Sequence, residues 1–295
     1  MALELIAPAK LNLTLEVLGK REDGYHEVVS LMQTIDLGDK VVLESAPTFE
    51  LRLDGDVAGV PDGESNLVYR AVQALEAATG TELGARITIT KRIPAGFGMG
   101  GGSTDAATAL RGLVKLHNLK LSQSELGAVA ASIGSDVTFF LHGGTALATG
   151  RGEVIEPLPD MPPQDLTLFT SHEDIADKTR RMYAQITPAD FSDASLTQRA
   201  VEVMRAGEPL TWWETGNAFD RHLKALAPRS AAAMRACTQA GVGVVATGAG
   251  PAFFSLMALP EMPEALLEKL RGEFGVTARA VRTLSRAESL AVREV

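Results

Sequence analysis

The feature that most constrains this chain is a glycine-rich segment between a predicted strand and a predicted helix. Residues 86–93, RITITKRI, alternate as a strand does, and residues 104–116, TDAATALRGLVKL, place apolar side chains at helical spacing. Between them, five glycines fall within seven residues: Gly96, Gly98, Gly100, Gly101 and Gly102. Glycine lets a backbone approach a polyphosphate closely, and a helix start offers free N–H groups and a positive dipole end. The segment therefore predicts a phosphate-binding loop.

Three known phosphate-binding patterns compete for this loop. A P-loop requires GxxxxGK[ST], but Gly102 stands where the lysine belongs. The dinucleotide-binding pattern GxGxxG fits three of the glycines, although no strand with an acidic residue about 20 positions on follows the helix to hold a ribose. Protein kinases share GxGxxG, but the chain has no VAIK, HRD or DFG segment. The loop therefore predicts a polyphosphate ligand without matching any of the three patterns.

The residues after the glycines are candidates for ligand contacts. From the first turn of the helix, Ser103 or Thr104 would bind a phosphate oxygen or a magnesium ion. Asp105 would be repelled by phosphate, so we expect it to interact with the helix dipole instead. The alternative is that the loop is only a flexible turn, with Ser103 or Thr104 as an ordinary helix cap.

Length and composition favour a cytoplasmic protein of two domains. The 295 residues are 45% hydrophobic and 22% charged, and no apolar run approaches the roughly 18 residues that a membrane span needs. The first residues, MALELIAPAKLN, lack the features of a signal peptide. The net charge of −9 argues against a nucleic-acid partner but is compatible with small anionic ligands. We expect no membrane partner, a monomer or weak homodimer, and a buried, inert thiol at the single cysteine, Cys237.

A proline-rich segment, residues 156–166, is the predicted linker between domains 1–158 and 159–295. Strands and helices are mixed in both parts, which favours the α+β class. A helix is predicted to run from residue 67 and end at Gly80, and a capping box opens the next helix after residue 116. The second domain is expected to hold a strand at 166–171, helices at 179–186, 196–206, 212–225, 230–239 and 264–274, two short strands around a second glycine turn at 247–251, and a strand at 276–284.

Residues 10–18, KLNLTLEVL, predict a half-buried strand. Leucine and valine alternate with polar residues, so Lys10 and Asn12 share the face opposite the apolar side chains. Asp136 begins a short apolar helix, DVTFFLHGG. The residues alone leave two interpretations of each: Lys10 is a site residue or a solvated lysine, and Asp136 is a site residue or only a helix N-cap.

Several segments together resemble the GHMP small-molecule kinases. They are PAGFGMGGGS, PAKLNLTLEVLGKREDGYHEV, SNLVYRA, GSDVTFFL and ATGAGPAFF, and they follow the order of the family over most of the chain. The resemblance implies a two-domain α+β architecture, with an amino-terminal domain like domain 2 of ribosomal protein S5 and a ferredoxin-like carboxyl-terminal domain. It also implies transfer of a phosphoryl group from ATP, with Mg²⁺. The most similar branch phosphorylates the 2-hydroxyl of a cytidine diphosphate derivative of methylerythritol, in the non-mevalonate isoprenoid pathway.

The resemblance also assigns roles to residues. Lys10 and Asp136 would be the catalytic pair. The acceptor would contact Asn12, Tyr25, His26, Thr179 and Tyr183, with Tyr183 as a second aromatic ring that sandwiches the cytosine. The ATP site would comprise Asn66, Lys91, Pro94, Ala95, Gly96, Phe97, Gly98, Met99, Gly100, Gly101, Gly102, Ser103 and Thr104, with Ser103 as a candidate metal contact.

Two residues depart from the loop that is usual in the family. Met99 stands where leucine is common, which is a mild change between flexible apolar residues. Phe97 stands where glycine is common, and a non-glycine residue resists positive φ. The first half of the loop is therefore not expected to keep the usual conformation.

Two rival functions stay open. A kinase of the same family could act on homoserine or mevalonate, but neither acceptor has a base to stack on Tyr25, His26 or Tyr183. An ATP-binding module without catalysis is the rival from another class, and the presence of Lys10 and Asp136 argues against it.

Overall fold

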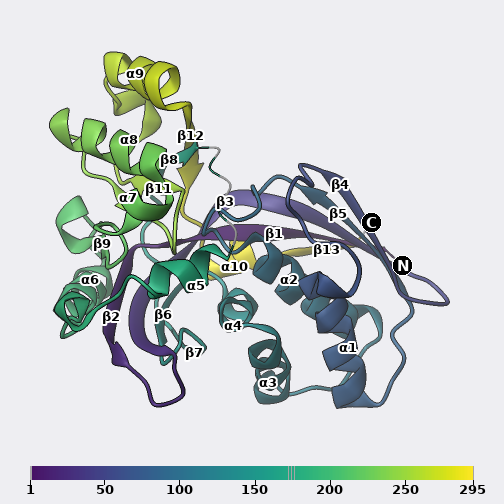
Figure 1. Cartoon of the computed structure of the whole chain (residues 1–295). Coiled ribbons are helices and arrows are strands. Elements are labelled where there is room, and N and C mark those ends of the chain that lie inside the picture. The colour runs from purple at the N-terminus through teal and green to yellow at the C-terminus, as the bar shows by residue number, and fades with distance from the viewer. Residues whose placement is uncertain (1, 172, 174, 176, 295) are drawn as a thin grey trace.

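The computed structural model of the protein describes residues 2–171, 173, 175 and 177–294. It consists of two β-sheets with helices packed on them. In the larger sheet, β3 is central and pairs with β1, β2, β5 and β6, while β13 and β9 add to β1 and β2 (Figure 1). Its strands are β1 (Ala2–Asn12), β2 (Thr14–Lys20), β3 (His26–Ser45), β4 (Glu50–Gly55), β5 (Ala85–Lys91), β6 (Thr145–Thr149), β7 (Val154–Pro157), β9 (Gly216–Asn217) and β13 (Val292–Glu294).

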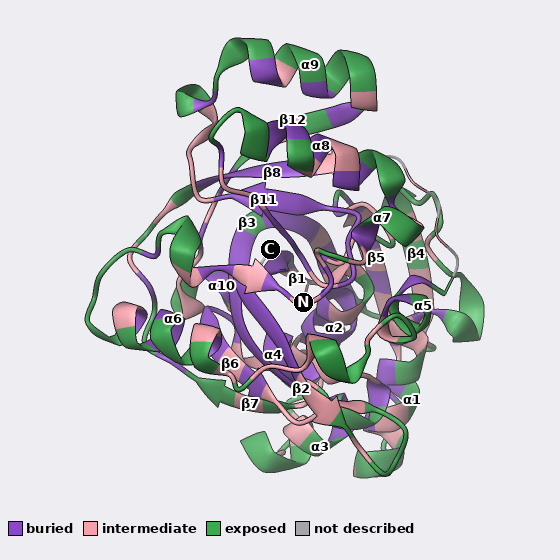
Figure 2. Cartoon of the chain, turned by 60° about the vertical axis from the view of Figure 1, so that its left-hand side comes forward, coloured by how far each residue is buried: buried purple, intermediate pink, exposed green. Residues whose placement is uncertain are grey.

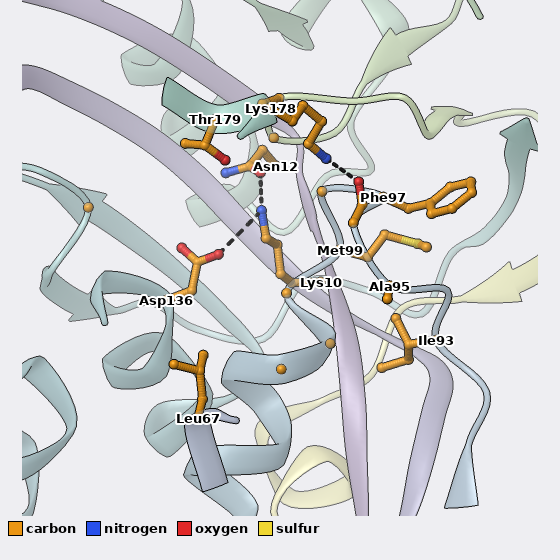
Figure 3. Close-up of a pocket in the computed structure, with 18 of the residues that line it drawn as sticks. Lys10, Asn12, Leu67, Ile93, Ala95, Phe97, Met99, Asp136, Lys178 and Thr179 are labelled. Atoms are coloured by element: carbon orange, nitrogen blue, oxygen red, sulfur yellow. Dashed lines mark hydrogen bonds and ion pairs between the residues drawn. The ribbon is translucent and has the colours of Figure 1, made fainter. Parts of the chain in front are cut away.

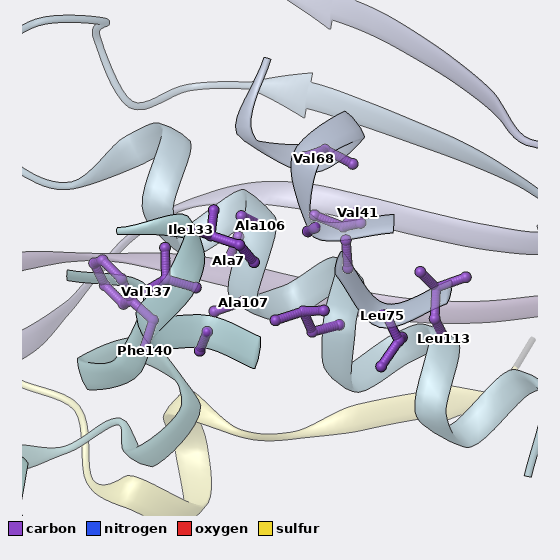
Figure 4. Packing of buried hydrophobic residues seen from close by; sticks show 14 of the residues in the cluster. Ala7, Val41, Val68, Leu75, Ala106, Ala107, Leu113, Ile133, Val137 and Phe140 are labelled. Carbon is purple, nitrogen blue, oxygen red and sulfur yellow. The ribbon is translucent and has the colours of Figure 1, made fainter. Parts of the chain in front are cut away.

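Four helices cover one face of this sheet (Figure 1): α1 (Leu67–Thr79), α2 (Gly101–Leu116), α3 (Gln123–Ile133) and α4 (Ser135–His142). The predicted end of α1 at Gly80 is confirmed, because that glycine has φ 65° and its N–H bonds to Glu76. The capping box of Ser122 and Glu125 is also confirmed. Figure 4 shows the packed side chains between helices and sheet, among them Ala7, Val41, Val68, Leu75, Ala106, Leu113, Ile133, Val137 and Phe140.

The amino-terminal strand differs from the prediction in two ways. It is interrupted at Leu13, so that β1 and β2 are separate strands. It is also buried on both faces, since Lys10 and Asn12 are each only 4% exposed. The alternation hid this because the two polar side chains are satisfied inside the protein: Lys10 pairs with Asp136 and donates to Asn12, and Asn12 Nδ2 donates to the Ser30 hydroxyl. The backbone N–H of Asn12 donates to the Thr247 hydroxyl of the second half. The solvated interpretation of Lys10 is therefore excluded.

The second half of the chain forms a four-stranded antiparallel sheet in the order β10 (Val245–Ala246), β11 (Phe253–Ser255), β8 (Asp165–Ser171) and β12 (Val276–Arg282). The α+β prediction is confirmed. Helices α8 (Pro228–Gln239) and α9 (Glu264–Phe274) belong to this half, and α9 turns an exposed face outward (Figure 2). The buried thiol of Cys237 lies in α8, and burial raises its pKa to about 11. The smaller helices are α5 (Lys178–Tyr183), α6 (Ser195–Arg205), α7 (Leu223–Leu226) and α10 (Arg286–Ser289).

The helix predicted at 212–225 is wrong. A short 3₁₀ turn at Trp212–Glu214 is followed by β9, which pairs in parallel with β2, and only Leu223–Leu226 is α-helical. The apolar spacing suggested a helix, but Gly216 is a poor helix former and pairing with β2 satisfies its backbone instead.

The two halves share a hydrophobic core. One buried cluster contains Leu11 and Leu31 from the first half together with Leu168, Val201 and Phe254 from the second. Strands β9 and β13 also return to the larger sheet from beyond the predicted linker. The division at residue 158 therefore stays a prediction. In the described residues, the helices are too short or too polar to cross a membrane.

Because of this shared core, a cavity on β1 should destabilise both halves at once. Leu11 is fully buried, so Leu11→Ala should lower the free energy of unfolding by about 2–5 kcal/mol. Ile6→Ala, on the same strand but at a side chain that is 42% exposed, is the control and should cost less than about 1 kcal/mol. Urea unfolding followed by circular dichroism and by tryptophan fluorescence should give one coincident transition, and separate transitions would contradict a shared core.

Candidate active site

A cavity of about 710 Å³ brings together most of the predicted site residues. Its wall includes the carboxyl end of β1, the glycine loop before α2, the start of α4, helix α5 and the second glycine turn. Figure 3 shows the two sides facing each other, with Lys10 and Asp136 on one and Lys178 and Thr179 on the other. The size is that of a small-molecule site.

Lys10 and Asp136 form an ion pair at the centre of this wall. Lys10 Nζ lies 3.9 Å from Asp136 Oδ2, and it also donates to the Asn12 side chain (Figure 3). Burial lowers the pKa of Lys10, while the charge of Asp136 acts to raise it. Asp136 is the second residue of α4, whose N-cap is Gly134, so its carboxylate is not a cap. Its side chain is 39% exposed to the cavity and to solvent.

The glycine loop is built from alternating left-handed residues. Gly96, Gly98 and Gly100 have φ between 75° and 81°, whereas Phe97 is not among the non-glycine residues with positive φ. The Phe97 ring points away from Lys10 and Asp136 (Figure 3) and packs on the hydrophobic cluster that the two halves share. The sequence thus places Phe97 where a side chain is tolerated. Whether the first half of the loop differs from that of the family stays a prediction.

The second glycine turn lies directly against this loop. A Cβ added to Gly98 would stand 2.2 Å from the Thr247 carbonyl oxygen and 3.2 Å from that of Gly250. Asn217 supports the turn from behind, because its Nδ2 donates to the carbonyls of Ala246 and Gly248, both at 2.8 Å. Only glycine fits at Gly98, since any side chain there would collide with backbone.

Ser103 and Thr104 lie in the first turn of α2 but do not line the cavity wall. Thr104 is fully buried, and its N–H bonds to the Gly100 carbonyl. Ser103 is half-buried. Neither residue is the helix cap, which is Gly100. Their contact with phosphate or metal stays a prediction, and burial makes Thr104 the weaker candidate.

Lys91 lies beneath the loop in a buried cluster of charges. Its Nζ is 2.6 Å from Asp105 Oδ2 and also bonds to Asp39. Burial raises the pKa of Asp105 to about 7, with Lys91 opposing this shift. Asp39 also accepts from the N–H of Ile93 at 2.9 Å. Lys91 reaches the cavity wall but is engaged with two carboxylates, and the prediction that Asp105 interacts with the helix dipole is replaced by this ion pair.

The remaining predicted ATP residues lie along the same wall. Asn66 caps α1 by accepting from Val68 N–H at 2.9 Å, and its Nδ2 donates to Pro61. The carbonyl of Met99 accepts from the Lys10 N–H at 3.1 Å, which fixes the loop to β1. The cavity lining also contains Pro94, Ala95, Gly96, Gly98, Gly100, Gly101 and Gly102.

Only some of the predicted base-binding residues line the cavity. His26 stacks on Tyr183 with ring centroids 5.1 Å apart, and burial raises the pKa of Tyr183 to about 12. Tyr25 is 57% exposed, and the Arg151 guanidinium lies 4.8 Å from its ring centroid. Tyr183 and Thr179 line the cavity, whereas Tyr25 and His26 lie beyond its wall. The rings therefore do not form an open sandwich in this structure.

Sequence reasoning missed two cations of this site. Lys178 precedes the predicted Thr179 and is almost buried, and Arg151 lies on the turn between β6 and β7. Both line the cavity. Their positions in the sequence could have indicated them as site residues, because Lys178 adjoins a predicted site residue and Arg151 lies between two glycines in TGRGE.

The contact between the two glycine turns gives a test with a matched control. Gly98→Ala and Gly241→Ala both place a side chain at a φ near 80°, but only the first meets backbone oxygens, because the space around Gly241 is open and lies outside the cavity. Both should therefore share a strain of about 1 kcal/mol. Gly98→Ala alone should separate the turns and weaken ATP binding by about tenfold or more, measured by calorimetry. Equal losses in the two variants would contradict the role of the contact.

Comparisons with known proteins identify the family of this chain. Residues 66–144 match the family model of the GHMP kinase N-terminal domain. A 4-diphosphocytidyl-2-C-methyl-D-erythritol kinase of Bacillus mycoides is 38% identical over 98% of this chain and 100% of its own length. One of Carboxydothermus hydrogenoformans is 53% identical over 53% of this chain and 54% of its own length.

Solved structures give the same result. A crystal structure of 4-(cytidine 5'-diphospho)-2C-methyl-D-erythritol kinase has a TM-score of 0.77 and 35% identity, and the match covers 95% of this chain and 98% of that one. The homoserine kinase of Cytophaga hutchinsonii has a TM-score of 0.70 at 19% identity, covering 96% and 95%, which supports the fold alone. The chain is thus an ATP-dependent small-molecule kinase and belongs to the GHMP kinase family.

Proposed function

We propose that this kinase transfers the γ-phosphoryl group of ATP to the 2-hydroxyl of 4-diphosphocytidyl-2-C-methyl-D-erythritol. The observation that carries the proposal is the Lys10 and Asp136 ion pair of 3.9 Å, which lies in the cavity beside the glycine loop. The names of relatives that match nearly the full length of the chain supply the acceptor.

The proposed mechanism uses the two residues in different ways. Phosphoryl transfer passes through a loose transition state, so positioning and charge stabilisation matter more than a strong base. Asp136 orients the acceptor hydroxyl and takes its proton as the new O–P bond forms and the bond to ADP breaks. Lys10 attracts and orients the carboxylate, and it offsets negative charge near the transferred group. Its burial strengthens both effects because little water screens it.

Magnesium is proposed as the second cofactor. The described residues hold no cluster of three acidic, histidine or cysteine ligands for a metal. This fits Mg²⁺, which typically uses one or two protein ligands together with substrate phosphates and water. Ser103, in the first turn of α2, is the proposed protein ligand. When bound, the ion would neutralise phosphate charge.

The base of the acceptor is proposed to bind beside Tyr25, His26 and Tyr183. Of the three rings, that of Tyr25 is exposed and is proposed to stack on the base. In this structure the Arg151 guanidinium lies over that ring. Thr179 and Asn12 face the cavity between the base and the catalytic pair. The site therefore has an aromatic end that homoserine and mevalonate would leave unused.

Removal of the carboxylate tests the catalytic roles. Asp136→Asn should lower kcat by about 100-fold or more, because the hydroxyl loses its proton acceptor, while affinity for an ATP analogue stays nearly unchanged. The control is Asp54→Asn, an exposed carboxylate on β4 outside the cavity, which should leave kcat intact. Steady-state kinetics and calorimetry give both quantities. A variant that keeps full turnover would refute the role of Asp136.

A parallel assay of acceptors tests specificity. The wild-type protein with Mg-ATP should phosphorylate the cytidyl substrate but neither mevalonate nor homoserine, with ADP release and ³¹P NMR as the measurements. Phosphorylation of mevalonate or homoserine alone would reject the acceptor proposed here and keep the family. No turnover with any acceptor, together with ATP binding, would favour the non-catalytic module.

A further inference from the structure

Lys178 is a buried lysine of the cavity that the proposed mechanism does not use. It is the first residue of α5 and only 9% exposed. Its Nζ donates to two backbone carbonyls, those of Gly96 in the glycine loop and Gly250 in the second glycine turn. Figure 3 shows the side chain reaching from α5 to the loop, on the same side of the cavity as Thr179. One ammonium group thus joins three segments that are far apart in the sequence.

The local structure gives no reason of its own for a lysine here. A cation at the amino end of a helix opposes the helix dipole. The residue before it, Asp177, has φ 49°, a conformation that a non-glycine residue rarely adopts. Burial, followed by the nearby charge of Lys10, lowers the pKa of Lys178 to about 7. These unfavourable features persist where surrounding contacts over-determine them, which is typical of functional sites.

The ion pairs of the described residues include Lys10 and Lys91 but not Lys178. Its Nζ is hydrogen-bonded instead to the two carbonyl oxygens, so the positions of those carbonyls depend on it. Both belong to turns that contact each other at Gly98, where the backbone atoms leave no space for a side chain. Loss of the ammonium would leave two carbonyls without a donor and would free the turns to separate.

We propose that Lys178 is a positioning residue, a clamp that holds the glycine loop against the second glycine turn and fixes α5 to both. This inference rests on the proposed function. The clamp links the phosphate half of the cavity to the helix that carries Thr179 and Tyr183. Binding of ATP would then favour the arrangement that binds the acceptor, and by reciprocity the acceptor would favour ATP by the same factor.

The test is Lys178→Met, which keeps the length of the side chain and removes the charge and the donors. Its affinity for a non-hydrolysable ATP analogue should fall by about tenfold, since hydrogen bonds from a charged group are lost. Lys178→Arg, which keeps the charge and the donors, should recover part of the affinity. The matched control is Arg181→Met, which removes one charge from an exposed position of the same helix and should leave the affinity unchanged.

The second measurement is the coupling between ligands. In the wild type the analogue should raise affinity for the cytidyl acceptor, and in Lys178→Met this factor should fall towards one. A purely stabilising residue would change the melting temperature and leave the coupling factor intact. Unchanged analogue affinity together with unchanged coupling in a folded Lys178→Met protein would overturn the proposal.

Two further outcomes keep the test decisive. If Lys178→Met does not fold, Lys178→Gln, which keeps amide donors without the charge, replaces it under the same criteria. If the wild type does not bind the cytidyl acceptor, the acceptor assignment fails. The clamp is then judged by analogue affinity alone, since nucleotide binding requires no acceptor: a loss in the methionine variant supports it, and no loss rejects it.

Discussion

The site depends on the way the end of β1 is held between two glycine turns. The N–H of Lys10 bonds to the Met99 carbonyl of the first turn, and the N–H of Asn12 bonds to Thr247 of the second, both at 3.1 Å. These two hydrogen bonds fix the position of Lys10 relative to the glycine loop and to Asp136. The turns can approach this closely because Gly98 has no side chain. Hydrogen bonds from the backbone of β1, one to the Met99 carbonyl and one to the Thr247 hydroxyl, therefore align the proposed catalytic pair with the expected phosphates.

The charges around the loop are arranged differently from those of a P-loop. The position that would hold the P-loop lysine is Gly102, and positive charge reaches the cavity from β1, β5 and α5 through Lys10, Lys91 and Lys178. Each is satisfied by its own set of oxygens: a carboxylate and an amide for Lys10, two carboxylates for Lys91, two backbone carbonyls for Lys178. Buried cations are tolerable only when paired in this way. Separate partners keep these charges from competing for one another's oxygens.

Much of the fold could be predicted because its signals were local. Gly80 ends α1, and the Ser122 and Glu125 box opens α3, since caps are decided by a few neighbouring residues. The two failures were tertiary. The polar side chains of β1 are buried because they bond to each other, to Ser30 and to Asp136, and β9 replaces a predicted helix because β2 offers it hydrogen bonds. In the site, motifs identified Lys10, Asp136 and the loop, but Lys178 is recognised only from carbonyls that lie about 70 to 80 residues away in the sequence.

The shared hydrophobic core has a consequence for how ligands enter. Side chains of both halves interdigitate in one cluster, so a hinge motion that swung the halves apart would expose Leu11, Leu168 and Phe254 to water. Such wide opening is energetically unfavourable compared with rearrangement at the cavity mouth. There the ring of Tyr25 is 57% exposed and the Arg151 side chain that lies over it is exposed as well, so both can move with little loss of buried contact. Ligands are therefore expected to enter and leave through side-chain movement at the aromatic end of the cavity, while the phosphate end stays rigid.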